Sequence, residues 1–223
     1  MKKKLLAGLA AGLIALGSFS MVEAAKPIVI QEQGSFTVGG TYKERPGKFS
    51  QENFVAEDGQ RAYGDFAYVE YQIPVKAKKL PLIFQHGGAQ SKRTWESGPD
   101  GREGFNTMFV RAGYSVYLID QPRSGEANLS TEAVTPDTPW ASNPMYGDKT
   151  LYVLSRIGHY DAAGNPVPNA QFPKGEKNYQ AFQQSWTIGS DPLDNDLNAD
   201  VLAELVNQQK DGAILVTHSY PHE

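Results

Sequence analysis

The sequence contains no cysteine, which excludes disulfide bridges, thiolate metal sites and cysteine nucleophiles in this chain. It also lacks a basic excess: 21 Lys and Arg stand against 25 Asp and Glu, and the formal net charge is −4 at pH 7. Since affinity for a phosphate backbone depends on clustered Lys and Arg, the composition argues against a nucleic-acid partner. Nucleotide-binding glycine motifs and His/carboxylate clusters at metal-binding spacing are absent too, so no cofactor is expected.

No apolar run is long enough to cross a bilayer, and the longest one has the layout of an export signal. Three lysines precede the apolar stretch Leu5–Leu16, which is shorter than the roughly 20 residues that a membrane span needs. Small residues at Val22 and Ala24 then form a cleavage site. We predict that residues 1–24 are a signal peptide and that the protein is exported to a periplasm or the medium. A stable membrane anchor is the disfavoured alternative.

The remaining residues, 25–223, suit one domain of alternating strands and helices. Residues 34–42 and 65–74 alternate apolar with polar side chains, which is typical of half-exposed antiparallel strands. Three continuous apolar runs follow, at Leu80–Phe84, Val116–Ile119 and Ala213–Val216, and such runs indicate parallel strands buried on both faces.

Two helices are predicted between these runs. The first covers residues 101–112, with Asp100 as its cap and Gly113 as its stop, and the second carries an apolar face from Leu197 to Val206. Strands alternating with helices in this way predict an α/β fold, an antiparallel start followed by parallel strands with helices on both faces.

The segment from about residue 126 to 200 interrupts this alternation. It is rich in proline and in aromatic side chains, and aromatic content argues against disorder. Long connections inside a compact domain are usually functional, so we predict a lid or cap over a site. A surface excursion without function is the alternative.

Ligands of open α/β sheets bind at the carboxyl ends of the parallel strands. Those ends are followed by His86-Gly87-Gly88-Ala89-Gln90, by Asp120-Gln121-Pro122-Arg123-Ser124-Gly125 and by Thr217-His218-Ser219-Tyr220-Pro221. In this order, each after an apolar run, the three segments resemble the α/β-hydrolase superfamily, in particular its bacterial exported esterase-like members.

The resemblance implies a serine hydrolase that cleaves a small-molecule ester through an acyl-enzyme. Ser219 would be the nucleophile on a tight turn after its strand, and the backbone N–H groups of Gly88 and Tyr220 would form the oxyanion hole. Ser219 could also be an ordinary serine at a strand end. We expect His86 and His218 to be structural rather than catalytic.

The turn residues Asp120 and Arg123 are expected to organise their loop, because Asx residues and the neighbouring Pro122 favour turns.

The chain departs from the family pattern at its carboxyl end. Thr217 and Pro221 stand where the nucleophile motif has glycines, and the acid and base of the family follow the nucleophile, whereas the sequence ends at Glu223. We therefore expect the N-terminal part of an esterase, cut by a frameshift, premature stop or gene-model error. Without acid and base it should be inactive as it stands, and its last strand should leave an apolar edge prone to aggregation.

Two classes of function remain. One is an exported serine hydrolase of carboxylic esters, and the other is a non-catalytic exported binding protein on a degenerate hydrolase fold. Labelling of Ser219 by a fluorophosphonate separates them from each other. The sequence predicts neither the identity of the ester nor an oligomeric state.

Overall fold

The computed structural model describes residues 27–88, 90–127, 130–131, 149, 152–153, 155–169, 171–185, 187 and 194–219. The predicted signal peptide, residues 1–24, lies outside them. Five strands form one mixed sheet in the order β1-β2-β4-β3-β7. Their bounds are β1 Ile30–Glu44, β2 Arg61–Pro74, β3 Leu82–Gln85, β4 Val116–Asp120 and β7 Ile214–Thr217.

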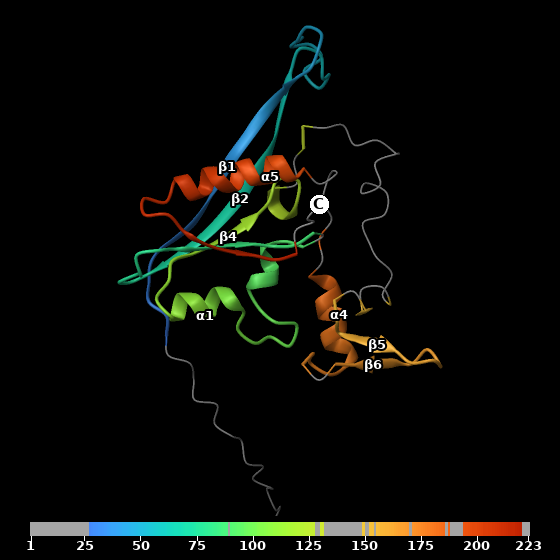
Figure 1. Ribbon diagram of the computed structural model, residues 1–223. Helices are drawn as coiled ribbons and strands as arrows, with labels where there is room; N and C mark the ends of the chain where they lie inside the picture. Colours follow the sequence, from blue (N-terminus) through green and yellow to red (C-terminus); the bar gives the residue numbers. More distant parts are fainter. Residues whose placement is uncertain are drawn as a thin grey trace, which may run out of the picture.

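The pairing follows the predicted division between antiparallel and parallel strands. β1 pairs antiparallel with β2, and β2 pairs antiparallel with β4. β3 lies parallel to β4 on one side and to β7 on the other. The first two strands extend beyond the rest of the sheet as a long hairpin, which projects at the top of Figure 1. The predicted α/β architecture is confirmed.

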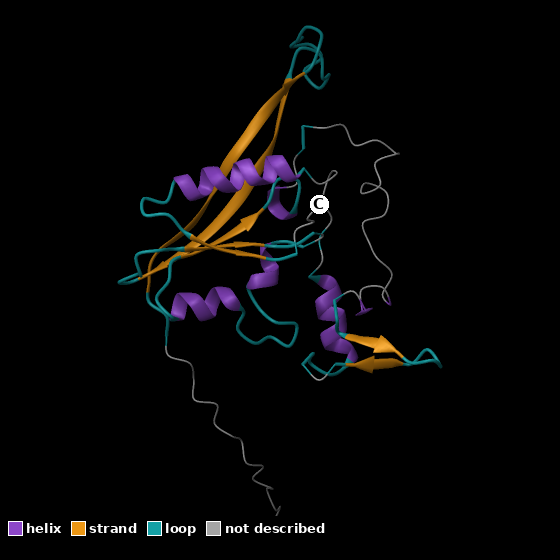
Figure 2. Ribbon diagram, in the orientation of Figure 1, coloured by secondary structure: helices purple, strands orange, loops and turns teal. Residues whose placement is uncertain are grey.

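Helices cover both faces of the sheet (Figure 2). Alternating strand residues divide between two apolar clusters, because successive side chains of a strand point to opposite faces. Helix α5 (Asn195–Asn207) contributes Val201 and Leu205 to the cluster that contains Ile83 and Ile119. Helix α1 (Phe105–Arg111) contributes Val110 to the cluster on the other face.

Helix α1 begins later than predicted, and Asp100 does not cap it. The N-cap is Gly104, with no side-chain cap bond, and a β-bridge joins Ser97 to Glu103 just before it. A side chain at Gly104 would come within 2.4 Å of the Trp95 carbonyl oxygen, so residues 97–104 are held as a tight excursion instead of a helical turn. The predicted stop is correct, since Gly113 has a φ of 86°.

Strand β7 is less buried than predicted. Ile214 and Leu215 are 39% and 45% exposed, whereas every residue of β3 is buried. Among the described strands, β7 pairs with β3 alone and lies at one end of the strand order. This exposure agrees with the expected apolar edge.

The connection between β4 and α5 contains a small unit of its own. Strands β5 (Gly158–Tyr160) and β6 (Pro166–Pro168) form an antiparallel pair, and helix α4 (Glu176–Gln184) follows them. Tyr152 lies against both Tyr160 and Tyr179, with ring centroids 5.2 and 5.6 Å away. The aromatic residues therefore form a packed unit, and its role as a lid stays a prediction.

Candidate active site

The carboxyl ends of β3, β4 and β7 meet at one edge of the sheet. Gln85, the last residue of β3, is in register with Ile119 of β4 and with Thr217 of β7. The three loop segments that follow these strands in the sequence therefore begin side by side. His218 continues the pairing beyond β7 by donating its backbone N–H to the Gln85 carbonyl, at 3.2 Å.

The loop after β3 approaches the end of β7 closely at Gly87. A methyl group on Gly87 would come within 3.0 Å of His218 Nδ1 and within 3.2 Å of the His218 carbonyl oxygen. Glycine at this position allows the close approach, since a side chain would require His218 to shift by a few tenths of an ångström. Gly88, the next residue, is exposed and has open space where a side chain would stand. The role of its N–H as an oxyanion-hole donor stays a prediction.

Gln90 connects the same two loops through its side chain, a role that was not predicted. Its Oε1 accepts the Gly87 N–H at 3.3 Å and lies 3.2 Å from His218 Nδ1. This contact engages the N–H of Gly87. Gln90 appeared in the predicted loop, but only the fold brings it to His218, 128 residues away.

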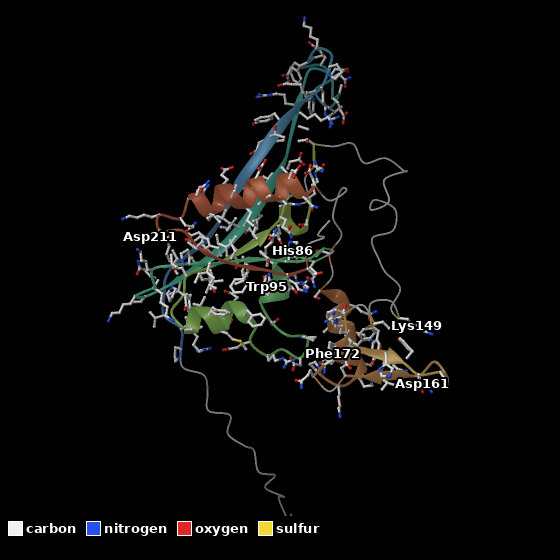
Figure 3. All side chains as sticks on the ribbon, in the orientation of Figure 1. His86, Trp95, Lys149, Asp161, Phe172 and Asp211 are labelled. Carbon is white, nitrogen blue, oxygen red and sulfur yellow. The ribbon has the colours of Figure 1, made fainter. Side chains whose placement is uncertain are left out.

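His86 is buried beneath this loop, 1% exposed (Figure 3). Its Nδ1 lies 2.8 Å from the Gly87 carbonyl oxygen, which can only accept, so we assign the proton to Nδ1. Burial lowers the pKa of His86, although the Gly87 carbonyl and the Asp120 carboxylate oppose this shift. A neutral, enclosed imidazole that holds the loop is consistent with the expected structural role.

Asp120 organises the loop after β4, as expected for a turn residue. It is 1% exposed, and its two carboxylate oxygens accept the backbone N–H groups of Lys92 and Glu126 at 2.6 and 3.0 Å. A side chain at Gly125 would come within 2.4 Å of the Asp120 carboxyl carbon, which explains the glycine in this turn. Asp120 thus ties the loop after β4 to the short helix η1 (Lys92–Trp95).

Lys92 is a buried cation that sequence patterns did not reveal. Its side chain is 8% exposed, and Nζ lies 2.6 Å from Glu126, 3.3 Å from Glu70 and 3.9 Å from Glu96. Burial alone would lower the pKa of Lys92, but the surrounding carboxylates raise it above its ordinary value. Lys92 is therefore protonated at neutral pH, which makes it unsuitable as a general base or nucleophile.

Ser219 follows β7 by two residues and is exposed. Its φ is 42°, a left-handed conformation that is uncommon outside glycine and that concentrates at functional turns. Such a turn presents a side chain away from the strand. Tyr220, the other predicted oxyanion donor, lies outside the described residues, and the nucleophilic role of Ser219 stays a prediction.

Two other kinds of site are relevant to the described part of the chain, metal clusters and membrane-spanning helices. The described residues contain no group of three or more His, Asp or Glu side chains placed to hold a metal ion. None of the described helices is both long and apolar enough to cross a membrane.

Comparison with solved structures finds that the fold of this chain is similar to that of an esterase. The atomic-resolution structure of a novel bacterial esterase superposes with a TM-score of 0.63 and is 27% identical in sequence. The match covers 87% of this chain and 62% of the esterase chain. The similarity therefore extends over nearly all of this chain but less than two thirds of the esterase.

A shorter similarity points to the same chemistry. A probable secreted lipase, phiG, from a fungal species (Fungal sp., strain ATCC 74256) is 39% identical over 61 residues, which is 27% of this chain and 17% of the lipase. No protein-family model matches the chain. The comparisons thus support an ester-hydrolase type of fold.

Proposed function

We propose that the protein is an exported serine hydrolase of carboxylic esters, of the α/β-hydrolase type, with Ser219 as its nucleophile. The observation that carries this proposal is the conformation of Ser219: an exposed serine with a left-handed φ of 42°, two residues beyond a parallel strand and next in sequence to His218, which contacts the glycine loop. The similarity to an esterase and to a secreted lipase supports both the chemistry and export.

In the proposed reaction, Ser219 Oγ attacks the ester carbonyl carbon and the alcohol leaves as the acyl-enzyme forms. Water then attacks the acyl-enzyme and releases the acid. The negative charge that develops on the carbonyl oxygen would be stabilised by the N–H groups of Gly88 and Tyr220. A rigid loop is essential for this, because donors must be in place before the charge appears. The contacts of His86 and Gln90 supply that rigidity.

The serine also requires a general base. His86 Nδ1 is engaged with the Gly87 carbonyl, and His218 Nδ1 lies against Gln90. Among the described residues, no histidine is hydrogen-bonded to Ser219. We therefore expect the base and its carboxylate partner to come from residues outside the described part of the protein.

The proposal is tested by covalent labelling. A fluorophosphonate probe should label Ser219 in the intact gene product that supplies the general base and its carboxylate partner, and Ser219→Ala should abolish the label because the probe reacts only with an activated serine. Ser50→Ala is the matched control, since Ser50 is exposed and bonds to Glu52 on the hairpin loop. Labelling is measured by intact-mass spectrometry.

Labelling that persists in Ser219→Ala would refute the assignment. Absence of labelling, together with a rise in Tm on adding a non-hydrolysable ester analogue, would favour a binding protein instead.

A further inference from the structure

Two residues in left-handed conformations meet just beyond the end of β4. Asp65 on β2 has a φ of 59°, and Arg123 in the loop after β4 has a φ of 66°. The register pairs Tyr68 with Asp120, so each of the two lies three residues beyond that pair. Such conformations cost free energy in non-glycine residues and persist where surrounding contacts enforce them.

The contacts that hold Asp65 and Arg123 are a largely buried, bidentate ion pair. Arg123 Nε donates to Asp65 Oδ1 at 2.9 Å, and Nη2 donates to Oδ2 at 3.2 Å. The two side chains are 11% and 6% exposed. This fork geometry fixes direction as well as distance, which a single charge contact does not.

The start and the end of the connection between β4 and α5 both reach this pair. Near its start, Thr131 donates its backbone N–H to Asp65 Oδ1 at 3.3 Å, and its hydroxyl donates to Oδ2. Near its end, Asp194 Oδ2 lies 3.9 Å from Arg123 Nη1. Asp194 also caps α5, because its side chain accepts the Leu197 N–H at 2.9 Å.

The same pair adjoins the network beneath the glycine loop. Ser124 follows Arg123, donates its hydroxyl to the Gln121 carbonyl at 2.8 Å, and lies 3.4 Å from His86 Nε2. His86 in turn contacts Gly87. A displacement of Arg123 would therefore reach both the connection and the loop that carries Gly88.

We propose that Asp65 and Arg123 are a positioning pair that fixes both ends of the connection between β4 and α5 beside the candidate active site, and so sets which esters are accepted. This inference rests on the proposed hydrolase function. Burial alone would raise the pKa of Asp65, but hydrogen bonds from Arg123 and Thr131 bring it below its ordinary value, so the pair is charged at neutral pH.

Two conservative variants separate the effect of the ion pair from the effect of the left-handed backbone conformations. Asp65→Asn removes the charge while keeping a residue that tolerates a left-handed φ, and Arg123→Lys keeps the charge but loses the fork. Asp211→Asn is the matched control, because Asp211 pairs with Lys79 at 3.2 Å at the other end of α5. All three are compared with the unchanged full-length protein.

Hydrogen exchange tests the positioning without requiring activity. In both variants the backbone amide hydrogens of Thr131 and of the first turn of α5 should exchange about tenfold faster. The amide hydrogens of β3 and β4 should exchange at unchanged rates, because the local opening does not involve the sheet. Exchange that is unchanged at these sites overturns the inference. Equal acceleration throughout the sheet also overturns it, because the pair would then serve only general stability.

Ester selectivity tests the consequence for the site. We compare kcat/KM for p-nitrophenyl octanoate with kcat/KM for p-nitrophenyl acetate. In both variants the octanoate-to-acetate ratio should fall about tenfold, mainly through a higher KM for the octanoate. The reason is that a long acyl chain extends to residues remote from the nucleophile. Asp211→Asn should leave the ratio unchanged. An equal loss on both esters overturns the inference. A protein with no esterase activity refutes the proposed function, and the exchange result then decides the positioning role alone.

Discussion

At the scale of single residues, His86 shows how burial and hydrogen bonding determine protonation. The imidazole is enclosed between the glycine loop and the loop after β4, with Nδ1 on the Gly87 carbonyl and Nε2 facing Gln121 and Ser124. The lowered pKa of His86 means that the folded protein resists protonation there, whereas the unfolded chain binds a proton near the ordinary value. Acid therefore favours unfolding through this residue.

The corresponding prediction concerns pH. The free energy of unfolding should decrease as the pH falls below about 6.5, because the unfolded state then binds one more proton than the folded state at His86. In His86→Asn this dependence should be shallower, at a lower stability overall. Urea unfolding at pH 7.5 and pH 5.5 measures both slopes, and identical slopes in the two proteins would contradict the assignment.

At the scale of elements, helix α5 and the β1–β2 hairpin depend on each other. Gly39 of β1 has a φ of 72°, and a side chain there would come within 2.7 Å of Val201 Cγ2. Close approach of helix and strand buries Leu205 completely, in the cluster with Val38 and Ala67. The apolar face of α5 that contacts the sheet therefore contributes most of the packing free energy of this helix.

Truncating Leu205 tests that contact. Leu205→Ala should lower the free energy of unfolding by about 2–5 kcal/mol, since a cavity remains where the side chain was fully enclosed. Leu202→Ala serves as the comparison, because Leu202 lies at the margin of the same cluster and is only partly buried. Chemical denaturation measures the free energy of unfolding of both variants. An equal loss at the two positions would contradict the complete enclosure of Leu205.

At the scale of the whole molecule, the sheet formed by the described strands has two different edges. β1 carries one edge and is long and largely polar on its exposed side, whereas β7 carries the other with exposed Ile214 and Leu215. An edge strand presents backbone N–H and C=O groups that can template pairing with another chain, and exposed apolar side chains favour that pairing. Association through β7 is the consequence that the sheet order predicts.

A charge on that edge should reduce association. Leu215→Lys should lower light scattering at high protein concentration, because lysine on an edge strand opposes strand pairing. Val55→Lys is the control: it introduces the same charge at an equally apolar residue, 76% exposed, in the hairpin loop outside any strand. A similar effect of both variants would attribute the change to net charge instead of the β7 edge.

Much of the fold was predictable because its signals are local. Side-chain alternation indicated β1 and β2, continuous apolar runs indicated β3, β4 and β7, and a 3.6-residue apolar period indicated α5. The start of α1 was wrong, because a β-bridge at Ser97 and the backbone contact at Gly104 override the cap signal of Asp100. Tertiary contacts of this kind leave no local pattern.

By itself the sequence determined the α/β class and the three segments at the strand ends. Only the tertiary structure decided which side chains meet: Gln90 with His218, Lys92 with Glu70 and Glu126, and Asp65 with Arg123, 58 residues away. Strand order sets these contacts, since β4 lies between β2 and β3. Local propensity encodes elements, whereas the pairing of distant polar groups depends on long-range packing that no single segment carries.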